Sequence, residues 1–242
     1  MSTPLTIALI GYGKMGKAIE GIALEKGYVI GLKIDTDNTQ ELTVNNLNKC
    51  DVAIEFTGPH SAIQNIKLCI DAGIPVVSGS TGWLHQWDEV KKYCEEKNGG
   101  LLYASNFSIG VNIFFELNKK LAALMSSHPE YNVEVEEIHH TAKKDAPSGT
   151  AITIAEQILE NYPTKNNWVN NAATTEDAIN ILSIRMDPAP GTHHVRYTSA
   201  IDDIEIIHTA HNRKGFATGA ILAAAFMKGK KGIFGMKEVL GL

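Results

Sequence analysis

The sequence predicts an α/β protein with a doubly wound parallel sheet, together with a second, α+β domain that has an open mixed sheet. Two observations lead to this fold class. Through residues 1–107, short apolar runs alternate with helical patterns, which is typical of βαβ units. From residue 131 onward, several segments alternate apolar and polar residues with one long helical pattern among them, which indicates the strands of a mixed sheet.

The first strand and the turn after it carry the pattern of a dinucleotide site. Residues 5–10 (LTIALI) form an apolar run, and a helical pattern follows the turn as far as Gly27. A second strand, residues 28–34, ends at Asp35, which suits an acid that binds ribose hydroxyls. This order favours a Rossmann-type domain over a glycine-rich turn in a non-binding α/β fold. The candidate cofactor residues here are Asp35 and the G-x-G-x-x-G run Gly11, Tyr12, Gly13, Lys14, Met15 and Gly16.

Three more strands are expected at residues 51–57, 75–78 and 101–104, with a helix at 61–72. The turns after these strands fall at the carboxyl ends of parallel strands, where open α/β sheets bind ligands. Each turn alone is most simply a plain turn, but as a set they can wall the nicotinamide end of the site. The candidate cofactor residues in them are Thr57, Gly79, Ser80, Thr81, Ala104, Ser105, Asn106 and Phe107.

Asp35 also bears on the choice of cofactor. Its carboxylate would repel the 2′-phosphate of NADP, and the next residues, Thr36, Asp37 and Asn38, include no arginine to receive that phosphate. We therefore expect NADH to be preferred, with NADPH also usable.

The segment 137–150 (EIHHTAKKDAPSGT) concentrates cationic and proton-exchanging side chains. Lys143 and Lys144 supply positive charge, and His139 and His140 can exchange protons near neutral pH. The two histidines follow a predicted strand, whose successive side chains point to opposite faces, so only one of them can face the reacting atoms.

A predicted helix, residues 149–161, begins directly after this basic segment. Ser148 is the expected N-cap, and Ser148, Gly149 and Thr150 lie where a helix N-terminus presents backbone N–H groups to an anion. The pattern predicts a pocket for a small anionic substrate that must be protonated. The alternative is a solvated lysine pair beside an ordinary capped helix.

Several segments resemble, in order, the dihydrodipicolinate reductase family (4-hydroxy-tetrahydrodipicolinate reductases) of bacterial lysine and diaminopimelate synthesis. The resemblance spans nearly the whole chain, and HH-x-x-K-x-DAPSGTA is its most specific part. The matching segments are GYGKMG at 11–16, EFTGP at 55–59, GSTG at 79–82, SNFSIGVN at 105–112, HHTAKKDAPSGTA at 139–151 and GIFGMKEVLGL at 232–242.

The resemblance implies a cytoplasmic homotetramer that reduces a cyclic dicarboxylate with a hydride from NADH or NADPH. His139 and Lys143 match the family's catalytic pair, and His140, Gly149 and Thr150 match its substrate contacts. The cofactor residues named above match its nucleotide-binding positions. We expect Lys143 to donate the proton to the enamine that hydride addition leaves, with His139 as its partner; His139 could also relay or donate that proton.

Two places depart from the family pattern. Arg185 and the Gly-x-His that ends at His193 are present, but the loop between them, residues 186–191, is short and rich in proline, which puts substrate contacts from both side chains in doubt. Arg213 is a candidate substrate-side or hinge residue, and an ordinary surface arginine is about as good a description of it.

The expected domains are a dinucleotide-binding domain, residues 1–107 and 213–242, and a substrate-binding and oligomerisation domain, residues 108–212. A linker and helix at 108–125 should join them, and a small-residue helix at 216–227 should pack on the first domain. The second domain should have strands near 131–140, 178–186, 194–200 and 203–210, and residues 166–175 are expected to be a polar loop.

The composition fits a metabolic enzyme. A net charge of −5 over 242 residues argues against nucleic acid or an anionic membrane as the main partner. Cys50, Cys69 and Cys94 form no CxxC pair and indicate reduced thiols. The first strand is expected to begin at residue 5, which leaves no room for a signal peptide, and no apolar stretch is long enough to span a bilayer. Nine histidines are present, but zinc-site spacings are missing and adjacent strand histidines point apart, so no metal site is expected.

Two other functions compete with the reductase. A different two-domain NAD(P) oxidoreductase would explain residues 1–107 but not the segment 137–150. A non-catalytic dinucleotide sensor would keep the glycine loop and Asp35 but would have no need of His139 and Lys143 beside a helix N-terminus.

Overall fold

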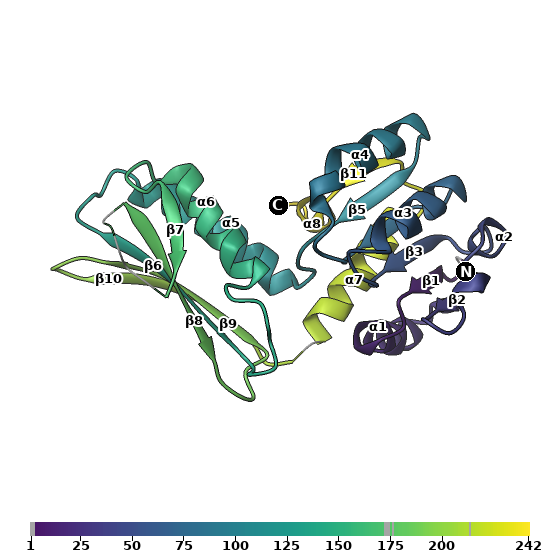
Figure 1. Ribbon diagram of the computed structural model, residues 1–242, viewed down its shortest axis with the longest axis horizontal. Coiled ribbons are helices and arrows are strands. Elements are labelled where there is room, and N and C mark those ends of the chain that lie inside the picture. Colours follow the sequence, from purple (N-terminus) through teal and green to yellow (C-terminus); the bar gives the residue numbers. More distant parts are fainter. Residues whose placement is uncertain (1–2, 172–174, 176, 213) are drawn as a thin grey trace. The chain divides into compact units, whose positions relative to one another are not determined.

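The computed structural model describes residues 3–171, 175, 177–212 and 214–242 (Figure 1). The chain divides into two compact units, Met1–Ile109 with Lys214–Leu242, and Gly110–Arg213. These are called the first and the second unit below. Arg213, a candidate from the sequence, lies outside the described residues, as do residues 172–174 of the expected polar loop.

The first unit contains a parallel sheet of six strands, in the order β11-β5-β4-β3-β1-β2. The predicted doubly wound sheet is therefore confirmed. From β2 at one edge the chain crosses β1 to reach β3, so the direction of winding reverses between β1 and β3. The strands are β1 (Thr6–Ile10), β2 (Val29–Ile34), β3 (Val52–Glu55), β4 (Val76–Ser78), β5 (Gly100–Tyr103) and β11 (Gly232–Phe234), the last of which the sequence analysis did not identify as a strand.

Helices cover both faces of this sheet. Successive side chains of a strand point to opposite faces, and here both sets are buried. In β1, Ile7 and Leu9 pack with α1 and α7, whereas Ala8 and Ile10 pack on the side of α2, α3 and α4. The helices are α1 (Lys14–Glu25), α2 (Val44–Leu47), α3 (Ala62–Asp71), α4 (Trp87–Glu96), α7 (Lys214–Met227) and α8 (Met236–Leu240), with 3₁₀ turns at Thr39–Glu41 and Leu84–Gln86.

The second unit is an open mixed sheet of five strands, as predicted, in the order β10-β9-β6-β8-β7. The β6–β8 and β8–β7 pairs are parallel, and the β10–β9 and β9–β6 pairs are antiparallel. The strands are β6 (Asn132–His139), β7 (Asn167–Asn170), β8 (Ala178–Arg185), β9 (Gly191–Thr198) and β10 (Asp203–Ala210).

Two expectations for this sheet were wrong in detail. The expected polar loop at 166–175 contains strand β7, whose polar residues lie at the edge of the described sheet, where β7 pairs with β8. Strand β9 begins at Gly191 rather than near residue 194, because its first residues pair with the ends of β6 and β10. Local composition did not reveal either feature, since both depend on pairing with distant strands.

Helices α5 (Ile109–Met125) and α6 (Gly149–Asn161) cover one face of the second sheet. On β6, Val133 and Val135 join the apolar core beneath them, but the next two residues on that face are Glu137 and His139, both buried. The covered face is therefore apolar along most of the strand and polar at its carboxyl end. Among the described residues, every helix is too short or too polar to span a lipid bilayer.

Gly219 in α7 makes a close backbone contact, because a Cβ at this position would overlap the carbonyl oxygen of Phe107. We expect Gly219→Ala to lower the free energy of unfolding by about 1–3 kcal/mol, as overpacking does. Gly21→Ala in α1 is the matched control, since a Cβ there meets nothing within 4 Å; it should stabilise the protein by up to about 1 kcal/mol through helix propensity. Urea unfolding measures both, and equal effects would contradict the assigned contact.

Candidate active site

Glu137 is fully buried, and its two carboxylate oxygens take different partners. Oε1 accepts hydrogen bonds from Arg185 Nη2 and from the backbone N–H of Ser148, each at 3.0 Å. Oε2 lies 3.2 Å from Nδ1 of His139. Burial alone would raise the pKa of this carboxyl, but the donors around it hold that pKa well below its usual range. Glu137 is therefore a negative charge in the interior, surrounded by groups from three elements.

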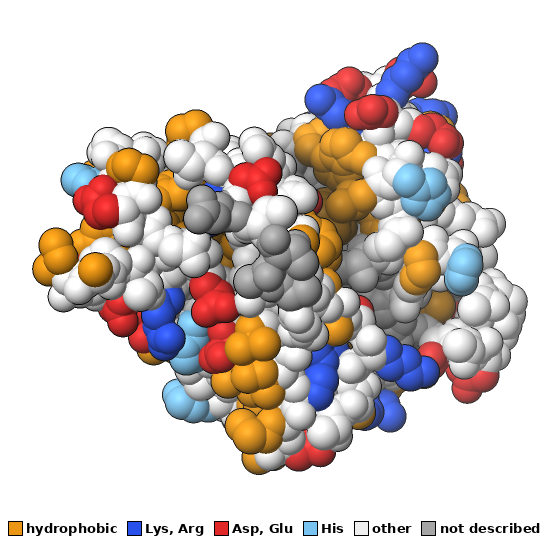
Figure 2. Space-filling model, turned by 60° about the vertical axis from the view of Figure 1, so that its left-hand side comes forward, with side chains coloured by type: hydrophobic (Ala, Val, Ile, Leu, Met, Phe, Trp, Pro, Cys, Tyr) orange, Lys and Arg blue, Asp and Glu red, His pale blue; other side chains and the backbone are white. Residues whose placement is uncertain are grey.

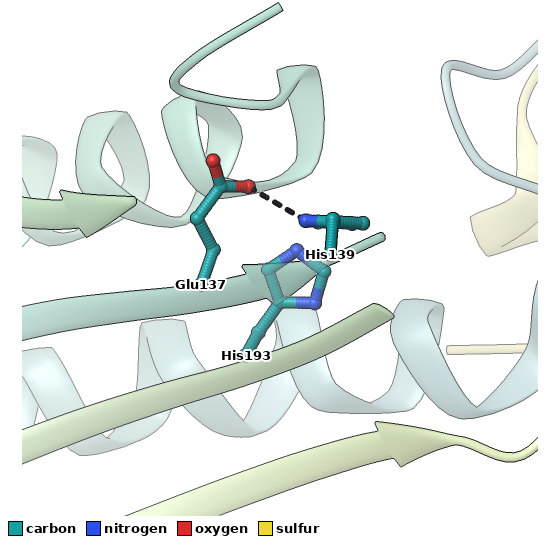
Figure 3. A group of neighbouring side chains, drawn as sticks. All are labelled: Glu137, His139 and His193. Atoms are coloured by element: carbon teal, nitrogen blue, oxygen red, sulfur yellow. Dashed lines mark ion pairs between the residues drawn. The ribbon is translucent and has the colours of Figure 1, made fainter. Parts of the chain in front are cut away.

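Glu137, His139 and His193 gather in one cluster (Figure 3) because of the sheet register. Glu137 is paired with His193 across β6 and β9, and His139 follows two positions later on the same face. The two imidazole rings meet edge-on, with centroids 5.2 Å apart and an interplanar angle of 72°. A Cβ on Gly191 would lie 3.0 Å from His139 Nε2, so the Gly-x-His sequence leaves room for the His139 ring.

His193 is uncharged at neutral pH. Burial lowers its pKa to about 3, and the nearby charges of His139 and Lys143 act in the same direction. Its Nε2 lies 3.5 Å from Ser148 Oγ, and its Nδ1 is enclosed without a hydrogen-bond partner in the described part of the chain. His193 thus contributes a neutral ring beside His139.

Arg185 makes its hydrogen bonds inside the protein. Besides Glu137, its guanidinium donates to the carbonyl oxygens of Asp145 at 2.6 Å and of Ile184 at 2.9 Å. These bonds hold the turn at 145–147 against the end of β8. The sequence left substrate contacts from Arg185 and His193 in doubt. In the structure both side chains contact residues of the protein itself: Arg185 bonds to Glu137, and His193 lies beside Ser148.

Lys143 lies in the loop after β6, with its Nζ 2.9 Å from Asp145 Oδ2 and its side chain 22% exposed. Its charge contributes to lowering the pKa of His193, so it acts on the same cluster. Lys144 is exposed, and His140, just beyond the end of β6, is half-buried. The structure thus separates the two histidines, and likewise the two lysines, by how deeply each side chain is buried.

Helix α6 begins at this cluster, as the sequence predicted. Ser148 is its N-cap, and its Oγ accepts a hydrogen bond from the N–H of Ala151 at 3.2 Å. Because the N–H of Ser148 is held by Glu137, the first helical residues, Gly149 and Thr150, start directly beside the buried carboxylate. The positive end of a helix and a lysine therefore lie together, an arrangement suited to an anion.

The proline-rich loop 186–190 is bonded to the same segment. The N–H of Met186 donates to the carbonyl of His139 at 2.7 Å. Thr141 donates its hydroxyl and its backbone N–H to the Asp187 carboxylate, at 2.5 and 3.3 Å. The loop therefore anchors the backbone on both sides of His140.

In the first unit, the glycine loop has the geometry expected of a dinucleotide site. Gly11 has φ +95°, and a Cβ there would overlap the carbonyl oxygen of Phe56. A Cβ on Gly16 would overlap the oxygen of Gly11, so this position keeps α1 close to the turn. At Gly13, the N-cap of α1, a Cβ meets nothing within 4 Å, which leaves backbone open to a pyrophosphate. Tyr12, Lys14 and Met15 complete the loop.

Asp35 follows β2 in a turn organised by Asn38. The Asn38 side chain accepts from the N–H of Asp35 at 2.7 Å and donates to the carbonyl of Lys33 at 2.9 Å. Asp35 Oδ1 accepts from the N–H of Thr36 at 2.8 Å. Lys33, the nearest cation in sequence, ion-pairs with Glu20 at 3.2 Å.

A second buried carboxylate, Glu55, organises the turns after β3 and β4. Its Oε1 accepts from the Thr57 N–H at 2.8 Å, the Thr57 hydroxyl at 2.5 Å and Ser80 Oγ at 2.7 Å. Its Oε2 accepts from Ser78 Oγ at 2.7 Å. Buried Trp83 donates to the carbonyl of Ser80 at 2.8 Å and so holds the turn that contains Thr81.

The turn after β5 packs against the same region. The rings of Phe56 and Phe107 lie 5.6 Å apart, and a Cβ on Gly79 would overlap the Phe56 ring. Asn106 is buried and accepts from the N–H of Ser108 at 2.9 Å, whereas Ala104 is half-buried and Ser105 is exposed. The structure thus brings the turns after β3, β4 and β5 together at the carboxyl end of the sheet.

Glu137, His139 and His193 could each offer one ligand atom to a metal, since three such atoms lie within 4.8 Å of one another. The sequence argument that adjacent histidines point apart overlooked that one histidine from each of two neighbouring strands can share a face. The surrounding charge opposes a cation, because Arg185 already neutralises Glu137 and Lys143 is near. The site is therefore better suited to an anion.

Comparison with known proteins decides the family. Residues 5–107 match the family described as dihydrodipicolinate reductase, N-terminus, and residues 110–240 match dihydrodipicolinate reductase, C-terminus. The chain is 49% identical over 236 residues to a 4-hydroxy-tetrahydrodipicolinate reductase of Christiangramia forsetii, covering 98% of each chain. The chain belongs to the dihydrodipicolinate reductase family.

Other relatives agree with this assignment. The reductase of Neisseria meningitidis is 30% identical over 270 residues, covering 99% of this chain and 98% of that protein. The fold matches a dihydrodipicolinate reductase from Paenisporosarcina sp. TG-14, solved with dipicolinate bound, at a TM-score of 0.76 and 24% identity, over 98% of this chain and 99% of that one. The predicted resemblance is confirmed, and with it reductase function and a nicotinamide cofactor.

Sequence reasoning missed the two buried glutamates of this reductase. The sequence did contain an indication for Glu137. Val133, Val135 and Glu137 are spaced two residues apart, so the charged side chain falls on the same buried face as the two valines. Such a residue needs buried partners. Glu55 stands in the quoted EFTGP segment, but its partners come from the next strand and its turn, which spacing does not reveal.

The neutral His193 predicts how stability depends on pH. Its pKa is about 3 in the fold against 6.5 when unfolded, so below pH 6.5 the unfolded chain binds the extra proton and stability falls as the pH is lowered. Replacing His193 with Asn should reduce that slope by about 1 kcal/mol per pH unit between about pH 6 and pH 5. Urea unfolding measures the slope, with His211→Asn, at an exposed position of the same unit, measured alongside as the comparison variant. An unchanged slope in the His193 variant would show that His193 is protonated in the fold.

Proposed function

We propose that this protein reduces 4-hydroxy-tetrahydrodipicolinate to tetrahydrodipicolinate with a hydride from NADH, as a step of lysine and diaminopimelate synthesis. The observation that carries the proposal is the joining of His139, Lys143 and the start of α6 around Glu137, in a chain of this family. A basic, proton-bearing cluster beside a helix N-terminus suits an anionic substrate whose reduction ends in protonation.

The substrate is a small cyclic dicarboxylate. We assign Ser148, Gly149 and Thr150 at the positive end of α6 to one carboxylate, with His140 and Lys143 as further contacts. Lys143 has Asp145 as its partner at 2.9 Å, and that ion pair can be exchanged for a substrate carboxylate because Asp145 itself is exposed. The Paenisporosarcina relative, solved with dipicolinate bound, supports this class of ligand.

His139 and Lys143 handle the proton. The nicotinamide cofactor supplies the hydride, and addition to a conjugated C=C–C=N unit moves electron density towards nitrogen. The resulting enamine carbon takes a proton, which we assign to Lys143, with His139 as its partner. Positive charge at Lys143 also stabilises the electron-rich intermediate.

The glycine loop and the strand-end turns hold the cofactor. The open backbone at Gly13 fits a pyrophosphate, and Asp35 fits the ribose hydroxyls. The turns organised by Glu55 hold the nicotinamide end. The full set that we assign is Gly11, Tyr12, Gly13, Lys14, Met15, Gly16, Asp35, Thr57, Gly79, Ser80, Thr81, Ala104, Ser105, Asn106 and Phe107.

We assign the residues 1–107 and 213–242 to cofactor binding and 108–212 to substrate binding and oligomerisation. A homotetramer would cover the sheet face that α5 and α6 leave open. Figure 2 shows large apolar side chains at the surface, and on β10 the exposed Ile207 lies on that open face, because it alternates with Ile206, which packs on the core beneath α5 and α6. The three buried, free cysteines support a reducing, cytoplasmic location.

Lys143→Ala tests the assigned chemistry. The variant should lose about 10²–10⁴-fold in kcat for NADH oxidation with freshly generated substrate, because it lacks the proton donor, while binding NADH normally. Absorbance of NADH follows the reaction, and fluorescence titration follows cofactor binding. Lys144→Ala is the matched control, since its side chain is exposed, and should retain activity. A wild-type protein that binds NADH without turnover would instead be a sensor.

Asp35→Asn tests the cofactor preference. Loss of the carboxylate should weaken NADH binding about tenfold, because one hydrogen bond to a charged group is lost. It should strengthen NADPH binding, because the repulsion of the 2′-phosphate is removed. Dissociation constants for both cofactors measure the change, with the exposed Asp37→Asn as control. Equal Kd values for NADH and NADPH in the wild type would refute the preference.

A further inference from the structure

We propose that Glu137 is a positioning residue that fixes His139 as the tautomer with its proton on Nδ1, so that Nε2 is the nitrogen that exchanges protons. The proposal rests on the function proposed above, because it concerns the partner of Lys143. It assigns a task to a fully buried residue outside the set proposed above to bind cofactor and substrate.

The contact itself sets which of the two groups carries the proton. Glu137 Oε2 and His139 Nδ1 form an ion pair at 3.2 Å, and within the described chain neither of these buried atoms has a hydrogen-bond partner of regular geometry, so each is the nearest partner that the other has. Oε1 is already occupied by Arg185 and Ser148. An ionised carboxylate can only accept, so the proton between Oε2 and Nδ1 belongs to the imidazole.

The rest of the ring environment agrees with this direction. His139 Nδ1 is enclosed, although 10% of the side chain remains exposed, so the accessible part of the residue lies elsewhere. Nε2 lies next to Gly191, where a Cβ would be 3.0 Å from it, so the glycine keeps a side chain at position 191 away from that edge of the ring. His193, uncharged, packs edge-on and limits rotation of the ring.

Charge balance explains why the position is a glutamate. When His139 takes a second proton, the carboxylate 3.2 Å away stabilises the imidazolium, and when it gives the proton up, Arg185 still compensates Glu137. A neutral partner could orient the ring but would not stabilise its charged form. The cluster is therefore arranged for a histidine that changes charge during turnover.

Substitution of Glu137 by glutamine should exchange donor and acceptor between residue 137 and His139 Nδ1. In Glu137→Gln the side-chain oxygen can still accept from Arg185 and Ser148, which turns the amide NH₂ towards His139. An NH₂ group donates, so Nδ1 must become the acceptor and the proton must move to Nε2. The variant should thus carry the opposite tautomer, with kcat reduced about 10²-fold or more and KM for NADH unchanged.

Nitrogen NMR of histidine side chains in ¹⁵N-histidine-labelled whole protein tests this directly. In the wild type, Nδ1 of His139 should show the shift of a protonated nitrogen and Nε2 that of an unprotonated one, with His139→Gln used to assign the signals. Glu137→Gln should exchange the two shifts. Glu136→Gln, one residue earlier and 3.8 Å from His194 across the sheet, should leave them unchanged.

The wild-type spectrum tests the proposal even if Glu137→Gln fails to fold, because a wild-type His139 with its proton on Nε2 would overturn it. Glu137→Asp, which keeps the charge, should restore the wild-type tautomer and more of kcat than Gln does. Stoichiometric Zn²⁺ that binds with loss of the Nδ1 proton would also overturn it, by showing a metal site. Wild-type protein with the expected tautomer but no reductase activity would refute the proposed function and leave the positioning of His139 intact.

Discussion

The second unit is organised by the need to satisfy one buried negative charge. An isolated carboxylate in a protein interior costs several kcal/mol, so Glu137 requires donors on both of its oxygens. Those donors are Arg185 from β8, the N-cap Ser148 of α6 and the ring of His139. Satisfying the charge therefore draws one strand end, one helix start and one imidazole to the same point, and the site is assembled as a result.

The first unit also contains a buried carboxylate that is satisfied by donors from neighbouring segments. Glu55 is buried at the end of β3, and its donors come from Thr57, Ser78 and Ser80. A short hydroxyl side chain can reach a carboxylate only if its backbone is close, so these bonds bring the turns after neighbouring strands together. In both units a charged residue of a strand end shapes the loops that carry the proposed binding residues.

Much of this architecture was predictable from sequence. Apolar runs and helical spacing are local signals, and they located the parallel sheet, the glycine loop, Ser148 as N-cap and the helix after it. Strands β7 and β11 were missed because each is short and depends on one distant neighbour. The links among Glu137, His193 and Arg185 were missed because they arise from register across β6, β8 and β9, which spacing along the chain does not encode.

The chain order of the first unit has a consequence for biosynthesis. Its sheet and core include α7, β11 and α8, which are made after the whole of the second unit. On the ribosome, the contiguous second unit can complete its own core while the first still lacks α7, which covers Ile7 and Leu9. The part of the first unit that precedes the second must then keep an incomplete apolar face in solution until α7 has been synthesised, so chaperone dependence should concentrate in that part of the chain.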